Sequence, residues 1–128
     1  MTDTDPMELE QAIAAAAEAL EFSSPGPDRA GALSRLASLL RERFQVDGDR
    51  ADLEHAIELN QQAVELAPDG PERALFLSNL AACLHASYQV DGDRGDLDKA
   101  ITLAQQALDL TPTGPDRTYR LHHLALML

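Results

Sequence analysis

Two short acidic loops carry the side chains best suited to bind a metal ion. Residues 47–54 place three aspartates and a glutamate around Gly48, and residues 91–98 repeat this arrangement around Gly92. Carboxylate oxygens on a tight loop suit a hard cation such as calcium. The spacing does not match the twelve-residue calcium loop, however, and each residue has a structural use, because glycine ends one helix and aspartate caps the next. We interpret both loops as helix caps and expect no metal or other cofactor.

Three histidines, His85, His122 and His123, are further candidates for metal ligands or catalytic bases. Adjacent residues on a helix point about 100° apart, so His122 and His123 cannot readily converge on one ion. No serine, cysteine or lysine stands beside a histidine in a pattern that indicates a nucleophile and its base. The lone Cys83 lies in an apolar helical pattern, which indicates a buried thiol. We therefore predict that the chain is not an enzyme.

A third motif places an arginine directly after a proline and an acidic residue. Arg29, Arg73 and Arg117 occupy it, each at the start of an expected helix. A cation near a helix N-terminus is electrostatically unfavourable. We therefore expect each arginine to form a structural ion pair between adjacent repeats.

The acidic loops and the arginine motif recur because the chain repeats itself. Residues 45–50 return unchanged as residues 89–94, a shift of 44 residues, and the proline-acid-arginine motif follows the same shift. Such a period is typical of stacked repeat architectures, in which each unit buries its apolar face against its neighbours. The acidic loops then lie between the helices of one repeat, and the arginines lie where one repeat meets the next.

Hydrophobic periodicity predicts six helices and no strand. Apolar residues recur at three-to-four-residue spacing, and segments rich in proline and glycine separate the periodic stretches. The expected helices cover residues 7–22, 27–45, 50–67, 72–89, 94–110 and 116–128. We therefore predict an all-α fold of about six helices that forms a single domain over residues 1–128.

Composition narrows the possible partners. The formal charge is -12, from 22 acidic against 10 basic residues, which disfavours nucleic acid and anionic membranes. The chain has no apolar run long enough to span a bilayer, and its first residues do not resemble a signal peptide. A cytoplasmic protein is expected, and the preference for arginine, alanine and leucine over lysine favours a bacterial origin.

The repeat resembles the tetratricopeptide repeat family. The second helix of that family carries two alanines seven residues apart and a proline five residues later, as do Ala56, Ala63 and Pro68, and the pattern recurs 44 residues on. The first helix carries a large residue, a leucine and a small residue, matched here by the stripe from Leu33 to Ala37. Family repeats are 34 residues long, and the ten additional residues here fall at helix ends and loops. Long repeats of this kind resemble arrays beside caspase-like or nucleotide-binding domains in bacterial and fungal multidomain proteins.

This resemblance divides the chain into repeats. A lone second-type helix at residues 7–22 precedes repeat 1 at residues 27–67, repeat 2 at residues 71–111 and a partial repeat 3 at residues 115–128. We call the helices that begin near residues 27, 71 and 115 first-type, and those that begin near residues 7, 50 and 94 second-type. Ala37, Ala81 and Ala125 are expected where the two helices of a repeat approach most closely.

This resemblance implies a right-handed solenoid of about six antiparallel helices. It also implies a non-catalytic protein-protein interaction module whose first-type helices line a concave groove. Few acids lie on these helices, so we expect a neutral-to-basic groove for a peptide or helix, with an acidic partner favoured. The groove residues expected from helical geometry are Ser34, Arg35, Ser38, Arg41, Gln45, Leu75, Ser78, Asn79, Ala82, His85, Gln89, Tyr119, His122 and Leu126.

A structural self-assembly unit is the alternative prediction. The chain opens on a second-type helix and closes on a first-type helix, which leaves two complementary apolar faces without a partner. These faces predict a homo-oligomer. The residues expected to mediate it are Leu121, Leu124, Ala125 and Leu128 on the last helix, and Leu9, Ile13 and Leu20 on the first.

Overall fold

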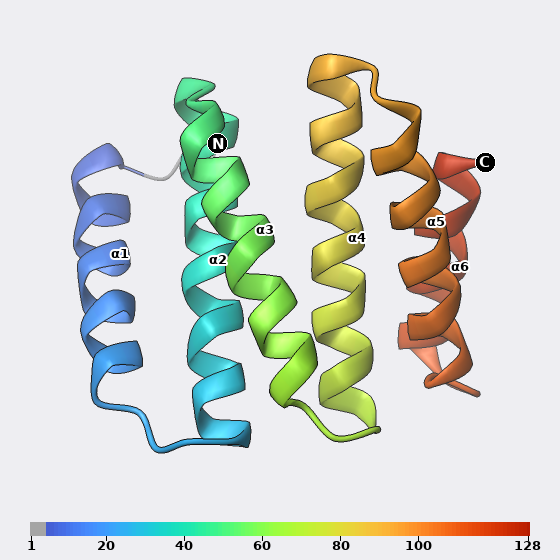
Figure 1. Ribbon diagram of the computed structural model, residues 1–128, viewed down its shortest axis with the longest axis horizontal. Helices are drawn as coiled ribbons and strands as arrows, with labels where there is room; N and C mark the ends of the chain where they lie inside the picture. Colours follow the sequence, from blue (N-terminus) through green and yellow to red (C-terminus); the bar gives the residue numbers. More distant parts are fainter. Residues whose placement is uncertain (1–4) are drawn as a thin grey trace. The chain divides into compact units, whose positions relative to one another are not determined.

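A computed structural model describes residues 5–128, and over this range it contains helices, turns and loops but no strand. Its helices are α1 (Pro6–Glu21), α2 (Pro27–Asp47), α3 (Arg50–Leu66), α4 (Pro71–Asp91), α5 (Arg94–Asp109) and α6 (Pro115–Met127) (Figure 1). The all-α class is confirmed, and each helix begins and ends within about two residues of its predicted bounds, which is the usual uncertainty of helix ends.

The chain forms two compact units, Met1–Leu66 and Ala67–Leu128. In the first unit α2 packs on both α1 and α3, and in the second unit α5 packs on both α4 and α6. The most extensive packing joins α2 to α3 and α4 to α5. These are the two helix pairs that the predicted repeats contain, and helices that pack on their chain neighbours are what a helical solenoid requires.

The first-type helices of the two full repeats end at a glycine and not at the last residue of the apolar stripe. Gly48 and Gly92 both have φ of 73°, the left-handed conformation that glycine adopts without steric cost. Their N–H groups donate to the carbonyls of Phe44 and Tyr88 at 2.7 Å. Both helices therefore extend two residues beyond the predicted ends, Gln45 and Gln89.

Alanine lines the closest helix contacts. Ala37 and Ala81 on the first-type helices are fully buried, as are Ala56 and Ala100 on the second-type helices that pack against them. A small side chain lets two helix axes approach, so these positions tolerate little added volume. The expectation for Ala125 is wrong, because no second-type helix follows α6 within the described residues and its side chain is exposed. Cys83 is buried, as predicted.

Candidate functional site

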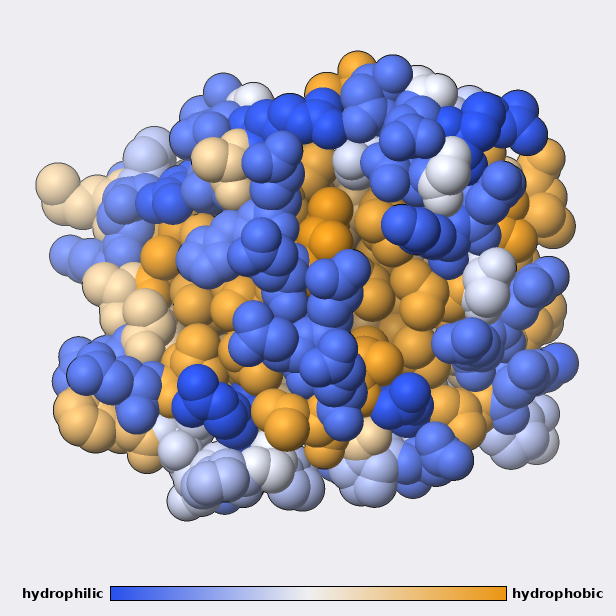
Figure 2. All heavy atoms as spheres, viewed as in Figure 1, coloured by the Kyte–Doolittle hydropathy of each residue, from blue (hydrophilic) through white to orange (hydrophobic). Residues whose placement is uncertain are grey.

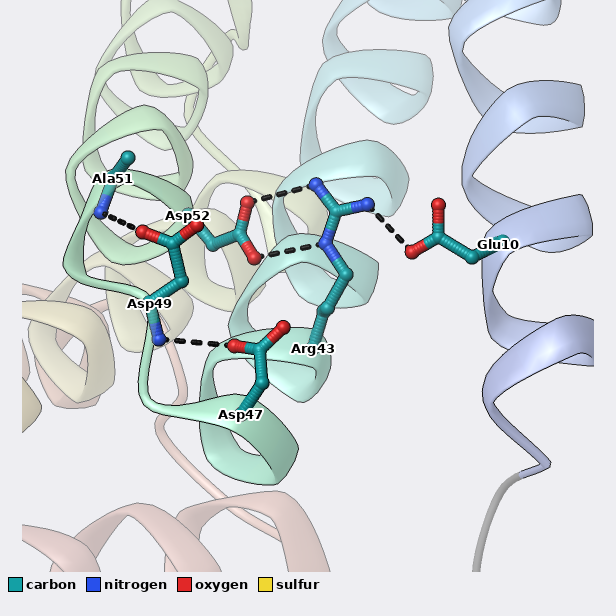
Figure 3. A network of polar contacts seen from close by, with 6 residues as sticks. All are labelled: Glu10, Arg43, Asp47, Asp49, Ala51 and Asp52. Atoms are coloured by element: carbon teal, nitrogen blue, oxygen red, sulfur yellow. Dashed lines mark hydrogen bonds and ion pairs between the residues drawn. The ribbon is translucent and has the colours of Figure 1, made fainter.

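The acidic loops are used for capping. The carboxylate of Asp49 accepts a hydrogen bond from the N–H of Ala51 at 3.0 Å, and that of Asp47 accepts from the N–H of Asp49 at 2.9 Å (Figure 3). The second loop repeats both bonds, since Asp93 accepts from Gly95 and Asp91 accepts from Asp93, each at 2.8 Å. The predicted capping role is thus confirmed. Within residues 5–128, no group of three acidic, histidine or cysteine side chains is arranged to hold a metal ion.

One member of the first loop, Asp52, belongs instead to a network that joins three helices. Arg43 on α2 donates to both carboxylate oxygens of Asp52 on α3, through Nε and Nη2 at 2.8 Å, and its Nη1 donates to Glu10 on α1 at 2.7 Å (Figure 3). The hydrogen bonds to Asp52 and then to Glu10 raise the pKa of the Arg43 guanidinium above its usual range. The side chain of Asp52 is 9% exposed and that of Glu10 is 59% exposed, so Asp52 carries most of the interaction.

In the second unit, a neutral hydroxyl takes the place of the Arg43 guanidinium as the hydrogen-bond donor. Ser87 occupies the repeat position of Arg43, and its hydroxyl donates to the carboxylate of Asp96 at 2.9 Å. Asp96 in turn is the repeat equivalent of Asp52. The loop aspartate therefore needs a donor from the first-type helix in both units, and the two units satisfy it with different chemistry.

The recurrent arginines bind carbonyl oxygens at the end of the preceding helix. The bonds run from Nη1 of Arg29 to Leu20 at 3.3 Å, from Nη1 of Arg73 to Ala67 at 3.0 Å, and from Nη1 of Arg117 to Leu108 at 3.0 Å and Thr111 at 2.9 Å. A guanidinium at the negative end of a helix dipole is favourable and satisfies carbonyls that lack helical partners. The expectation that these arginines form ion pairs between adjacent repeats is therefore wrong. Arg73 also lies 3.6 Å from the carboxylate of the exposed Asp69, but Asp69 belongs to the loop just before α4.

The outward face of α3 is polar. Figure 2 shows hydrophilic side chains along α3, with hydrophobic side chains beside it over α2. The exposed residues of α3 include Glu54, Glu58 and Glu65. This second-type helix thus presents an acidic, solvated face, and the apolar and neutral polar surface lies elsewhere.

In the first unit, α2 supplies the predicted groove residues. Arg35, Ser38 and Gln45 are exposed, and Arg41 is half-buried with an Nε that has no hydrogen-bond partner among the described residues. Ser34 is 5% exposed and belongs to the packed side of the helix. This surface of α2 is thus accessible and carries two arginines.

In the second unit, a cleft separates the N-terminal halves of α4 and α6. Its volume is about 420 Å³, and four predicted groove residues line it, namely Leu75, Ser78, Asn79 and Tyr119. Leu75 is 47% exposed and Tyr119 is 65% exposed, which is unusual for large apolar side chains on a solvated face. The structure therefore brings residues from two first-type helices together in one concave site.

The histidines lie further along the same two helices. The ring centroids of His85 and His123 are 6.3 Å apart, and the ring of Tyr119 stacks on His123 at 6.5 Å. His123, which is not among the predicted groove residues, is thus the histidine that faces α4. His122, a predicted groove residue, is exposed, as are Gln89 and Leu126, while Ala82 is half-buried.

The charges around the cleft differ from the expected neutral-to-basic lining. Glu72 and Asp116, in the first turns of α4 and α6, contribute two carboxylates, and Arg120 contributes one guanidinium. Arg120 was absent from the predicted groove because its position follows the buried stripe. Its repeat equivalents, Ala32 and Phe76, are apolar. A comparison of the repeats could therefore have identified Arg120, because an arginine stands there in place of an apolar residue.

The predicted self-association residues fall into two groups. Leu121 is 45% exposed and Leu128 is 81% exposed, Ala125 is exposed, and Leu124 is half-buried, all on or beside α6. On α1, by contrast, Leu9 is buried and Ile13 and Leu20 are half-buried. Only α6 therefore exposes large apolar side chains of the predicted set.

Comparison with known proteins assigns the first full repeat. Residues 29–72 match the family model described as tetratricopeptide repeat, a segment that contains nearly all of α2, the whole of α3 and the start of α4. No curated protein matches the chain. None of the helices within residues 5–128 combines the length and apolar character that a membrane span needs.

Proposed function

Because residues 29–72 are a tetratricopeptide repeat, we propose that the chain is a non-catalytic module that binds another protein or a peptide through its first-type helices. Repeats of this family generally mediate protein-protein interactions. The observation that carries the proposal is the cleft between α4 and α6, where Leu75 and Tyr119 expose apolar surface beside the polar groups of Ser78 and Asn79. A hollow that combines exposed apolar side chains with convergent polar groups is a usual form of a binding site.

The exposed surface of α2 supports a second contact of a different charge. Arg35 is exposed and Arg41 is half-buried, so this surface of the first unit carries two positive charges. Positive charges on an accessible surface favour a ligand that brings a carboxylate. The predicted acidic ligand is therefore proposed for the surface of α2.

Self-assembly, the alternative function, has less support. A head-to-tail assembly requires apolar faces on both terminal helices, and the residues expected on α1 are buried or half-buried. The exposed Leu121 and Leu128 favour a contact at α6 alone. We therefore rank partner binding above self-assembly.

A double substitution, with one change on the first-type helices of each unit, should weaken partner binding. Peptides selected from a random display library against the immobilised protein provide the ligand, and fluorescence anisotropy measures its dissociation constant. In Arg41→Ala with Tyr119→Ala we expect at least about a tenfold rise in the dissociation constant, because an aromatic anchor and a charged donor are lost together. The control, Glu58→Ala with Thr102→Ala on the outward faces of α3 and α5, should bind like the parent.

Equal affinity in the parent and in the Arg41 and Tyr119 variant would contradict the proposal. Helix content measured by circular dichroism should be unchanged in both variants, since all four side chains are exposed or half-buried. A loss of binding therefore cannot be attributed to unfolding.

A further inference from the structure

Arg120 is an arginine in a position that the repeat otherwise keeps apolar. It is 7% exposed, and its equivalent in α4, Phe76, is 5% exposed. Its Nη1 donates to the carbonyl of Asp116 at 3.3 Å, a long bond within the same helix, and its Nε has no hydrogen-bond partner among the described residues. Burying a charged group with an unpaired donor is costly. This cost indicates that the guanidinium serves a purpose other than packing.

Arg120 lines two adjacent cavities. One is the α4–α6 cleft, and the other, of about 210 Å³, is lined by the loop between α5 and α6 and includes Thr111. Two carboxylates, Glu72 and Asp116, share the cleft with Arg120, and no ion pair within 4.0 Å joins Arg120 to either of them in residues 5–128. The cleft thus offers separate acidic and basic groups to a ligand.

The balance of charge decides which ligand fits. Two carboxylates against one guanidinium repel an additional carboxylate and attract a cation. A neutral carbonyl oxygen can still accept a hydrogen bond from Arg120 without opposing the two acids. The net charge of the chain, -12, also accelerates encounter with a basic partner. Leu75 and Tyr119 provide apolar surface for the methylene stem of a lysine side chain.

We propose that the α4–α6 cleft binds a lysine-containing extended segment of a partner protein. The carboxylates of Glu72 and Asp116 bind the lysine ammonium, and Arg120 donates to a main-chain carbonyl of the same segment. This inference rests on the proposed function and gives it a ligand class. It replaces the expected acidic ligand at this cleft, while the surface of α2 keeps its own preference.

A charge-matched comparison tests the two carboxylates. The probe is a short fluorescein-labelled peptide of alternating glycine and lysine with blocked ends, and anisotropy reports its dissociation constant. Glu72→Gln with Asp116→Asn should raise that constant about tenfold or more, because charge-assisted hydrogen bonds are lost. Asp98→Asn with Asp109→Asn on α5 removes the same net charge at exposed positions outside the cleft, and it should change the constant by less than about twofold.

Substitution of Arg120 separates a specific contact from general attraction. Arg120→Met removes a positive charge, so electrostatics alone would strengthen binding of a lysine peptide. We expect the opposite, a loss of roughly fivefold, because the donor to the main-chain carbonyl is gone. Arg120→Phe, which introduces the residue of the equivalent position in α4, serves the same purpose if the methionine variant does not fold.

Equal losses in the two charge-matched variants would overturn the inference, as would tighter binding by Arg120→Met. Stronger binding of the corresponding glutamate peptide would also overturn it, and would leave the proposed function standing. Failure of the proposed function would give a different result. The dissociation constants of peptides selected from an unbiased library would then not change on substitution of the first-type helices.

Discussion

Replacing Arg43 with alanine is expected to lower the free energy of unfolding of the first unit by about 2–3 kcal/mol. The substitution leaves the carboxylate of Asp52, 9% exposed, without the two hydrogen bonds that hold it at 2.8 Å. A buried charge that loses its partner retains its desolvation cost. Chemical denaturation followed by circular dichroism measures the effect, and hydrogen exchange assigns it to residues 5–66.

The second unit suggests the control for this prediction. Arg43→Ser installs the donor that Ser87 supplies to Asp96, so it should recover about 1 kcal/mol of what Arg43→Ala loses. Glu10→Gln should cost less than about 1 kcal/mol, because Glu10 is 59% exposed and water screens its pair. If Arg43→Ala and Glu10→Gln were equally mild, the network would not stabilise the contact between α2 and α3.

Adding volume at the closest helix contacts should have the next largest effect. Ala37 on α2 and Ala81 on α4 are fully buried, and these helices pack most extensively on α3 and α5. Ala37→Leu and Ala81→Leu should each cost roughly 1–3 kcal/mol, because a larger side chain must force the helix pair apart. The melting temperature and the denaturation midpoint of each variant measure this cost.

The third alanine of the series provides a matched control. Ala125 occupies the same repeat position on α6 but is exposed, so Ala125→Leu should change the free energy of unfolding by less than about 0.5 kcal/mol. A stability loss at Ala125 equal to that at Ala81 would contradict the helix register. So would a melting temperature of the Ala81 variant that equals that of the parent.

Sequence patterns predict the helices well because their determinants are local. Proline at the first turn, aspartate caps and the glycine at residues 48 and 92 act within a few residues of chain. The arginine motif was misassigned because a helix terminus offers two kinds of partner, acidic side chains and carbonyl oxygens. Sequence spacing alone does not show whether an arginine at a helix end binds a side-chain carboxylate or a main-chain carbonyl. Arg117 binds main-chain carbonyls.

The cleft was predicted in part. Helical geometry placed Leu75, Asn79 and Tyr119 on one face, and these residues line the site. It did not include Arg120, because a rule based on apolar stripes treats that position as core. It also favoured His122 over His123, since the contact between the rings of His123 and His85 depends on tertiary packing, which helical geometry does not include.

The central claim is that, within each unit, first-type helices and not second-type helices form the binding surface. Amide chemical shifts measured by NMR during titration with a library-selected peptide test it most directly. The account predicts the largest shift changes on α2, α4 and α6, with Leu75, Asn79 and Tyr119 among them. Shift changes confined to the outward faces of α3 and α5 would contradict it.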